Sequence, residues 1–173
     1  MSEKWAKGVH VRMEVEITKY SKKDIRDMMH IWNEVVEEGV AFPQVDFLTE
    51  ENAPDFFARQ DYVGVAKVED KVVGLYILHP NNVGRCGHQA NTSYAVSSKV
   101  RGLKIGEKLV KDSLQKAKDL NYKLMIFNAV VKGNDRAIRL YTKLGFVKVG
   151  EIPKGFLLKD GKYQDIMVFY HSL

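Results

Sequence analysis

The sequence predicts an α+β domain built on a largely antiparallel sheet. Strand-like and helical patterns follow one another in the order strand, helix, helix, three strands, helix, strand, helix, two strands. The helix that follows a glycine-containing segment supplies one parallel step, because parallel neighbours need a crossover connection. A length of 173 residues suits one such domain, which we expect to span residues 1–173.

The first half of the chain contains one strongly amphipathic helix. Ser21 with Asp24 three positions later resembles a capping box, and apolar residues then recur on one helical face until Gly39 provides a stop. The neighbouring segments are rich in β-branched and aromatic residues, as strands are. The other elements predicted here are a strand over residues 11–17, a short helix after Thr49, and strands over residues 62–68 and 72–78 joined by a turn at residues 69–71.

The second half alternates strands and helices before it closes with two strands. Residues 79–87 are rich in Asn and Gly and are predicted to form an irregular loop. Asn134 is a suitable cap for the last helix, which Gly145 ends. The remaining predicted elements are a strand over residues 89–96, an amphipathic helix after Gly106, a buried strand over residues 123–131, and closing strands over residues 146–152 and 163–170.

Composition and charge argue against several classes of protein. No apolar run approaches the ~20 residues of a membrane span, and the first residues do not read as a secretory signal, so we expect a cytoplasmic protein. Cys86 is the only cysteine, which excludes an internal disulfide framework. The formal charge of +5 comes from scattered basic residues, so we expect neither specific nucleic-acid binding nor a membrane partner. His79, Cys86 and His88 match no zinc spacing, and we expect no metal site.

The strand–helix connection over residues 96–106 is the segment whose sequence most strongly indicates a binding function. It leads from a predicted strand directly into a helix and contains Gly102 and Gly106. The first N–H groups of a helix have no partner within the helix, and the helix dipole adds partial positive charge, so an anion such as phosphate binds well there. Glycines let the backbone approach the anion closely, although at such a junction they also serve in turns and caps alone.

The connection over residues 96–106 is followed by further motif residues. The full set is Val96, Arg101, Gly102, Gly106, Asn134, Tyr141 and the ending Leu144-Gly145-Phe146. With these residues the chain resembles the GNAT N-acetyltransferase superfamily, and the connection resembles its pyrophosphate loop. The resemblance implies an acetyl-CoA-dependent N-acetyltransferase with about seven strands and about four helices, in which the central fourth and fifth strands splay apart. It leaves open a homodimer through the two closing strands.

The resemblance also implies how acetyl-CoA is held. The backbone near Val96 would pair with the pantetheine arm, the N–H groups of the loop would hold the pyrophosphate, and Asn134 would contact pantetheine or serve only as a helix cap. Lys104 departs from the family, which usually has a glycine there; its side chain tolerates the required backbone angles less easily, while its charge favours phosphate. The implied cofactor-binding residues are Tyr94, Ala95, Val96, Arg101, Gly102, Leu103, Lys104, Ile105, Gly106 and Asn134.

Tyr141 matches the family tyrosine that protonates the departing CoA thiolate. A phenol with a pKa of ~10 stays protonated at neutral pH and serves as a general acid; the alternative is a tyrosine that only packs in the core. The general base is less defined, because residues 88–94 contain no carboxylate. Glu34, Glu37 and Glu38 on the first helix form either a solvated face or the source of a remote base.

Two asparagines are candidates for binding the acceptor. Asn91 and Asn128 fall on the strands that flank the acceptor site of the family, and their amides can orient an amine or a carboxylate without taking its proton. Arg85 is available for a carboxylate in the loop before residue 89. We expect a small-molecule amine, such as an amino acid or analogue. The alternatives are a non-catalytic CoA-sensing module and a protein acetyltransferase.

Overall fold

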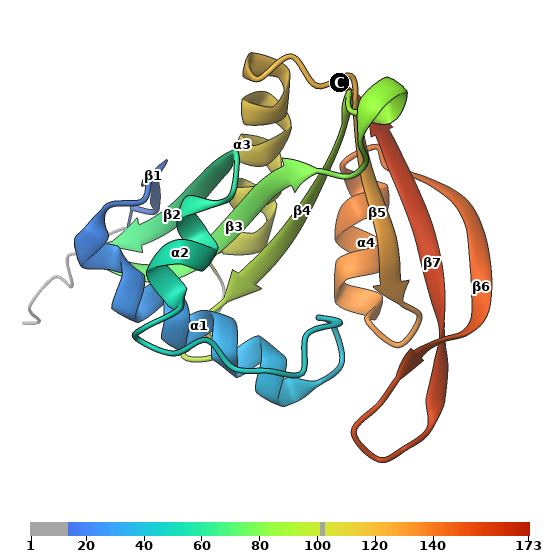
Figure 1. The fold of residues 1–173 in the computed structure, drawn as a ribbon, viewed down its shortest axis with the longest axis horizontal. Helices are drawn as coiled ribbons and strands as arrows, with labels where there is room; N and C mark the ends of the chain where they lie inside the picture. Colours follow the sequence, from blue (N-terminus) through green and yellow to red (C-terminus); the bar gives the residue numbers. More distant parts are fainter. Residues whose placement is uncertain (1–13, 101–102) are drawn as a thin grey trace, which may run out of the picture.

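Seven strands form one mixed sheet within residues 14–100 and 103–173, which the computed structural model describes (Figure 1). The strand order is β1-β2-β3-β4-β5-β7-β6, with β4 and β5 parallel and all other neighbours antiparallel. The predicted α+β class is therefore confirmed. The strands are β1 (Glu16–Lys19), β2 (Tyr62–Val68), β3 (Lys71–Pro80), β4 (Gln89–Val96), β5 (Leu124–Val131), β6 (Val147–Leu157) and β7 (Tyr163–Ser172).

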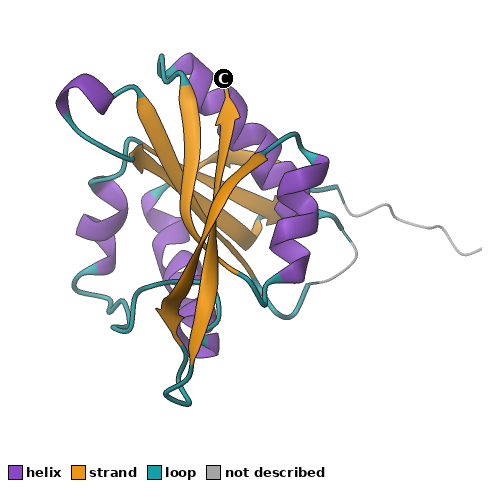
Figure 2. Ribbon diagram, turned by 90° about the vertical axis from the view of Figure 1, so that its right-hand side faces the viewer, coloured by secondary structure: helices purple, strands orange, loops and turns teal. Residues whose placement is uncertain are grey.

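Helices cover both faces of the sheet (Figure 2). Two separate cores show this arrangement: Trp32 of the first helix packs in one, and Leu109 of the third helix packs in the other. The two cores are divided by the sheet itself, so a gap between its strands would join one face to the other. The helices are α1 (Ile25–Glu38), α2 (Ala53–Ala58), α3 (Ile105–Asp119) and α4 (Asp135–Lys143), with short 3-10 turns η1 (Lys22–Asp24) and η2 (Gly84–Cys86).

Helix α1 begins at a buried acidic residue. The Asp24 carboxylate accepts hydrogen bonds from the Ser21 N–H and hydroxyl groups, both at 2.8 Å, as the capping-box pattern predicts. Lys67 of β2 pairs with the same carboxylate at 2.9 Å. Burial alone would raise the pKa of Asp24, but the hydrogen bonds from Lys67 and Ser21 lower it below its ordinary value. The pair therefore fixes the amino end of α1 on the sheet.

Strands β4 and β5 separate soon after they meet. Their parallel pairing covers only Gln89 with Leu124 and Ala90 with Met125, although each strand has eight residues. Figure 1 shows the two strands diverging beyond this point. The splay predicted for the fourth and fifth strands is thus present, and from Asn91 onward one edge of β4 has no strand partner among the described residues.

Strands β3, β5 and β7 lie within two residues of their predicted bounds, whereas β1 and β6 differ more. Strand β1 runs over Glu16–Lys19, so it ends later than the predicted residue 17, and part of the predicted range lies outside the described residues. Strand β6 continues to Leu157, five residues past the predicted end. A register shift between Ile152 and Phe156 allows the strand to continue, because it accommodates a proline, which has no N–H, and Lys154 in the left-handed region.

Candidate functional site

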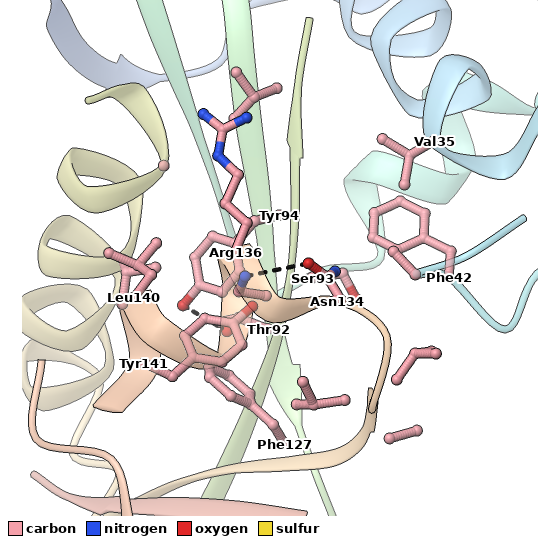
Figure 3. A pocket seen from close by; sticks show the side chains of 18 of the residues that line it. Val35, Phe42, Thr92, Ser93, Tyr94, Phe127, Asn134, Arg136, Leu140 and Tyr141 are labelled. Atoms are coloured by element: carbon pink, nitrogen blue, oxygen red, sulfur yellow. Dashed lines mark hydrogen bonds between the residues drawn. The ribbon is translucent and has the colours of Figure 1, made fainter. Parts of the chain in front are cut away.

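A cavity of about 410 Å³ fills the gap between β4 and β5 (Figure 3). Its walls come from both sides of the sheet, and we call it the cleft. On one side are Gly106 of α3 and Tyr141 of α4, and on the other are Val35 and Glu38 of α1. Because the strands do not pair here, the cleft runs through the sheet and exposes a ligand on one face to a ligand on the other.

The open edge of β4 offers main-chain groups to the cleft. Lys123 N–H, just before β5, donates to the His88 carbonyl at 2.9 Å, whereas Ser97 N–H donates to Val73 of β3, also at 2.9 Å. Neighbouring residues in a strand turn their N–H and C=O groups to opposite edges. Even-numbered residues of β4 therefore turn these groups toward β5, and odd-numbered residues turn them toward β3.

This alternation separates the predicted cofactor residues of β4 into two groups. Tyr94 and Val96 direct their N–H and C=O groups into the splay, where no strand of the described chain takes them up. Ala95 instead directs its N–H and C=O groups toward β3, and its side chain is buried on the α1 face. Tyr94 and Val96 can therefore bind an extended ligand through the main chain, as an added strand would, whereas Ala95 only supports them.

The start of α3 lies at one end of the cleft. Lys104 caps the helix with φ 53° and ψ 33°, in the left-handed region that glycine favours. Ile105 is buried, Leu103 is half-buried, and Gly106 lines the cleft, where an added Cβ would lie 3.6 Å from Leu140. The helix therefore presents its first N–H groups beside the cleft. The predicted residues Arg101 and Gly102 lie outside the described residues.

Tyr141 reaches the cleft from α4. Its ring centroid lies 4.5 Å from that of Phe127 and 6.3 Å from that of Tyr94. Burial, and to a smaller extent Tyr94, raises the pKa of Tyr141 well above its ordinary value, so the phenol stays protonated. Its hydroxyl makes no hydrogen bond with another residue in the described part of the chain. Tyr141 is therefore a neutral donor with its proton uncommitted.

A hydrogen-bonded series holds Tyr94 beside it. Thr92 donates to the Tyr94 hydroxyl at 2.8 Å, and the Tyr94 and Ser113 hydroxyls lie 2.7 Å apart. Ser113 gives its own proton to the Val110 carbonyl at 2.8 Å, so Tyr94 must be the donor to Ser113. Burial raises the pKa of Tyr94 to about 12, and its two hydrogen bonds offset only part of that effect. These contacts fix the ring that packs against Tyr141.

Asn134 and Arg136 line the cleft from the first turn of α4. The Asn134 side chain accepts a hydrogen bond from Ala137 N–H at 3.1 Å, which confirms its capping role. Arg136 was not predicted, although it lies within the motif that begins at Asn134. Its guanidinium extends away from Tyr141 (Figure 3). Among the described residues that line the cleft, Arg136 is the only base and Glu38 is the only acid.

On the α1 side, the two predicted asparagines lie next to each other. Asn91 of β4 and Asn128 of β5 both line the cleft and both donate to the same atom, Asn81 Oδ1, at 3.0 and 2.5 Å. Asn81 was predicted only as part of a loop, and no sequence signal distinguishes it from Asn82 beside it. Arg85 is exposed in η2 and is not among the residues that line the cleft.

The three glutamates of α1 have different surroundings. Glu34 accepts a hydrogen bond from Ser98 N–H at 2.9 Å, just after β4. Glu37 forms an ion pair with Lys159 of the β6–β7 turn at 2.9 Å. Glu38 lines the cleft and forms no ion pair with another residue that the structure describes. It is therefore the candidate among the three for a charge that acts on a ligand.

A fixed loop closes the α1 side of the cleft. Phe42 lines the cleft, is buried, and packs on Trp32 with ring centroids 4.4 Å apart. The Asn33 side chain both donates to the Leu48 carbonyl, at 2.8 Å, and accepts from Leu48 N–H, at 2.9 Å. Both ends of the loop over residues 40–48 are thereby attached to α1. The sequence indicated a loop here but not its place at the site.

No group of three or more His, Cys, Asp or Glu side chains placed to hold a metal ion occurs within residues 14–100 and 103–173. In the same part of the chain, no helix has the length and apolar character needed to cross a membrane.

Comparison with known proteins relates this site to a family. The sequence model of the Acetyltransferase (GNAT) family matches residues 25–146. N-acetyltransferase aca1 of Schizosaccharomyces pombe is 29% identical over 158 residues, which cover 80% of this chain and 76% of the relative. A GCN5-related N-acetyltransferase from Kribbella flavida is 26% identical, with a TM-score of 0.84, and the match covers 92% of this chain and 98% of the other.

A second solved structure shows the same fold at lower identity. It is a GNAT phosphinothricin acetyltransferase from Sinorhizobium meliloti in complex with acetyl-CoA, which is 21% identical with a TM-score of 0.84; the match covers 92% of this chain and 88% of the other. The family match spans more than half of the chain and includes α1, the splayed strands, α3 and the catalytic candidate on α4. The chain belongs to the acetyltransferase (GNAT) family and is an acetyl-CoA-dependent N-acetyltransferase.

Proposed function

We propose that the enzyme acetylates the amine of a small molecule, such as an amino acid or analogue. The observation that carries this proposal is the loop that lines the acceptor side of the cleft. The cleft has about 410 Å³ for both ligands, and the loop over residues 40–48 covers it with Phe42 held against Trp32. Preformed pockets of this size are typical of small-molecule sites. The ion pair between Glu37 and Lys159 also ties the β6–β7 turn to α1, which narrows the approach for a peptide.

The residues of the cleft fit acetyl-CoA on the α3–α4 side. The open edge of β4 takes the extended pantetheine arm through the main chain of Tyr94 and Val96. The N–H groups at the start of α3 and the Arg136 guanidinium supply favourable charge for phosphates. When bound, acetyl-CoA supplies a thioester whose carbonyl carbon the amine attacks directly.

Three groups of this chain promote that attack. The main-chain N–H groups near Val96 orient and polarise the carbonyl. Tyr141, whose raised pKa keeps the phenol neutral, donates its hydroxyl proton toward the sulfur as negative charge develops on the departing thiolate. Glu38, on the opposite wall, accepts the proton released by the amine through a water molecule. The products are the N-acetylated amine and the CoA thiol.

Isotope-labelled acetyl-CoA, incubated with a panel of small amines and a panel of lysine-containing peptides, tests the proposal. We expect transfer to at least one small amine with a kcat/KM at least about tenfold above that for any peptide. Faster transfer to a peptide would contradict the small-molecule acceptor. Tight CoA binding without transfer to any amine would contradict the proposed reaction.

A further inference from the structure

One loop residue joins the two strands just where they separate. Asn81 follows the end of β3, and its Oδ1 atom accepts hydrogen bonds from Asn91 Nδ2, at 3.0 Å, and from Asn128 Nδ2, at 2.5 Å. Ala90 and Met125 form the last pair between β4 and β5. Asn81 therefore bridges the strands through side chains at the position where the main-chain bonds stop.

Asn81 is itself held in place. Its N–H group donates to the Gln89 carbonyl at 2.7 Å, and its side chain is half-buried. It does not line the cleft, whereas Asn91 and Asn128 do. Asn81 thus lies behind the two amides relative to the ligand, where it can act on them without touching an acceptor.

The shared oxygen sets the orientation of both amides. An asparagine amide carries its carbonyl oxygen and its NH2 group on the same carbon, so fixing the nitrogen also fixes the oxygen. Each of the two amides uses an N–H on Asn81 and keeps its carbonyl oxygen free to accept. A reacting neutral amine presents N–H donors and one lone pair. Acceptors that hold the N–H groups leave the lone pair free for attack.

We propose that Asn81 is a positioning residue that makes Asn91 and Asn128 a pair of hydrogen-bond acceptors for the substrate amine. This inference rests on the proposed function and narrows it: the amide pair recognises N–H donors, and a carboxylate of the substrate must bind elsewhere. A carboxylate facing the two oxygens would meet two acceptors and no donor. The polarity of the amide pair is therefore a specificity determinant that Asn81 imposes.

Substitutions at residue 81 test whether this residue orients the two amides or only supports the fold. Asn81→Asp keeps an acceptor for both N–H groups, whereas Asn81→Ala removes it. Asn82→Ala is the matched control, because Asn82 is exposed and its side chain accepts a hydrogen bond from the neighbouring Val83 N–H. The probes are spermidine, L-lysine, L-proline and glycinamide, with kinetics measured on whichever of them the wild type acetylates fastest. Denaturant unfolding confirms that each variant is folded.

We expect Asn81→Ala to raise the KM for the amine about tenfold and to leave the KM for acetyl-CoA within twofold. Asn81→Asp should restore the amine KM to within about threefold of wild type, and Asn82→Ala should not change it. If Asn81→Asp raises the KM as much as Asn81→Ala does, residue 81 acts as a donor and the inference is wrong. An unchanged amine KM in Asn81→Ala also contradicts it.

Amide proton exchange, measured without substrate, tests the role of Asn81 separately from the proposed function. In ¹⁵N-labelled protein, the side-chain NH2 protons of Asn91, which is half-buried, should exchange more slowly with solvent in wild type and Asn81→Asp than in Asn81→Ala. Equal exchange rates in the three proteins would overturn the role of Asn81 whatever the activity. Slow exchange without acetylation of any small amine or peptide would instead overturn the proposed function, and with it the substrate assigned to the amide pair.

Discussion

The two sides of the cleft are built in different ways. The α3–α4 side offers main-chain groups at the open edge of β4 and at the start of α3 at Ile105, together with the side chains of Arg136 and Tyr141. The α1 side uses side chains from separate segments, including Glu38, Phe42 and Asn91. The first side follows from the topology, because splayed parallel strands expose the edge of β4. The second can change its side chains, and so its acceptor, while the sheet stays the same.

The charges of the cleft follow the same division. Arg136 lies on the α4 wall and Glu38 on the α1 wall, and no other charged side chain within the described residues lines the cleft. A cationic group suits the phosphates of acetyl-CoA, and an anionic group suits an amine and the proton it releases. The following predictions test whether the two sides act separately, from the largest expected effect to the smallest.

Tyr141→Phe should lower the rate of the reaction while leaving the binding sites on both sides of the cleft intact. Removing the donor to the departing sulfur is expected to lower kcat about 100-fold, within the range of general acid catalysis. The KM for acetyl-CoA should change less than threefold, because the ring still packs against Phe127. Steady-state kinetics measure both constants. Tyr163→Phe, at an exposed position of β7, is the control and should behave as wild type. A kcat that survives in Tyr141→Phe would place the acid elsewhere.

Glu38→Gln tests the proton acceptor on the α1 side. The variant keeps the size of the side chain but removes its charge, so we expect kcat/KM for the amine to fall about tenfold. Glu37→Gln is the matched control, since it breaks only a surface ion pair with Lys159. Acetyl-CoA binding, measured by calorimetry, should be the same in all three proteins. Equal activity of the two variants would remove Glu38 from the mechanism.

Lys104→Gly separates charge from backbone strain on the cofactor side. A non-glycine residue in the left-handed region destabilises the folded state by about 1–2 kcal/mol. Replacing it with glycine removes this strain, but glycine loses more backbone entropy on folding, which offsets part of the stabilisation. The free energy of unfolding of the variant should therefore be about 0.5–1 kcal/mol higher than that of wild type. The lost charge should raise the KM for acetyl-CoA about threefold. Lys104→Ala should raise the KM equally without the gain in stability. An unchanged KM in both variants would show that Lys104 does not assist phosphate binding.

The pH profile should show no loss from Tyr141 in the neutral to alkaline range. Its pKa is raised, so the phenol remains protonated as the pH rises through the ordinary tyrosine pKa of ~10. Tyr94, with a pKa of about 12, also stays neutral there. We expect kcat to rise with the deprotonation of the amine and then to remain level up to about pH 10. A fall in kcat with a pKa near 9 that disappears in Tyr141→Phe would contradict the protonated donor.

The sequence predicted the cofactor side better than the acceptor side. Asn134 caps the helix that carries Tyr141, and the motif that contains both residues, like the splay of the two central strands, was implied by the resemblance to the GNAT superfamily. The alternation that turns Ala95 toward β3 required the register of the sheet.

The acceptor side depends on contacts across long separations. Asn128 meets Asn81 across 47 positions, and Phe42 becomes a wall only because it packs on Trp32. Neither Asn81 nor Phe42 differs by residue type from others in its loop. Three glutamates on one helix were equivalent by sequence, and only the ion pair of Glu37 and the hydrogen bond of Glu34 set Glu38 apart.

An NMR titration tests the division of the cleft most directly. We predict that CoA, added to ¹⁵N-labelled protein, shifts the main-chain signals of Tyr94, Val96 and Gly106 and leaves the side-chain amides of Asn91 and Asn128 nearly unmoved. An acetylated small amine, added next, should then shift those two amides. If CoA shifts the asparagine amides while the amine shifts the start of α3, the two sides have been assigned the wrong way round and the account is wrong.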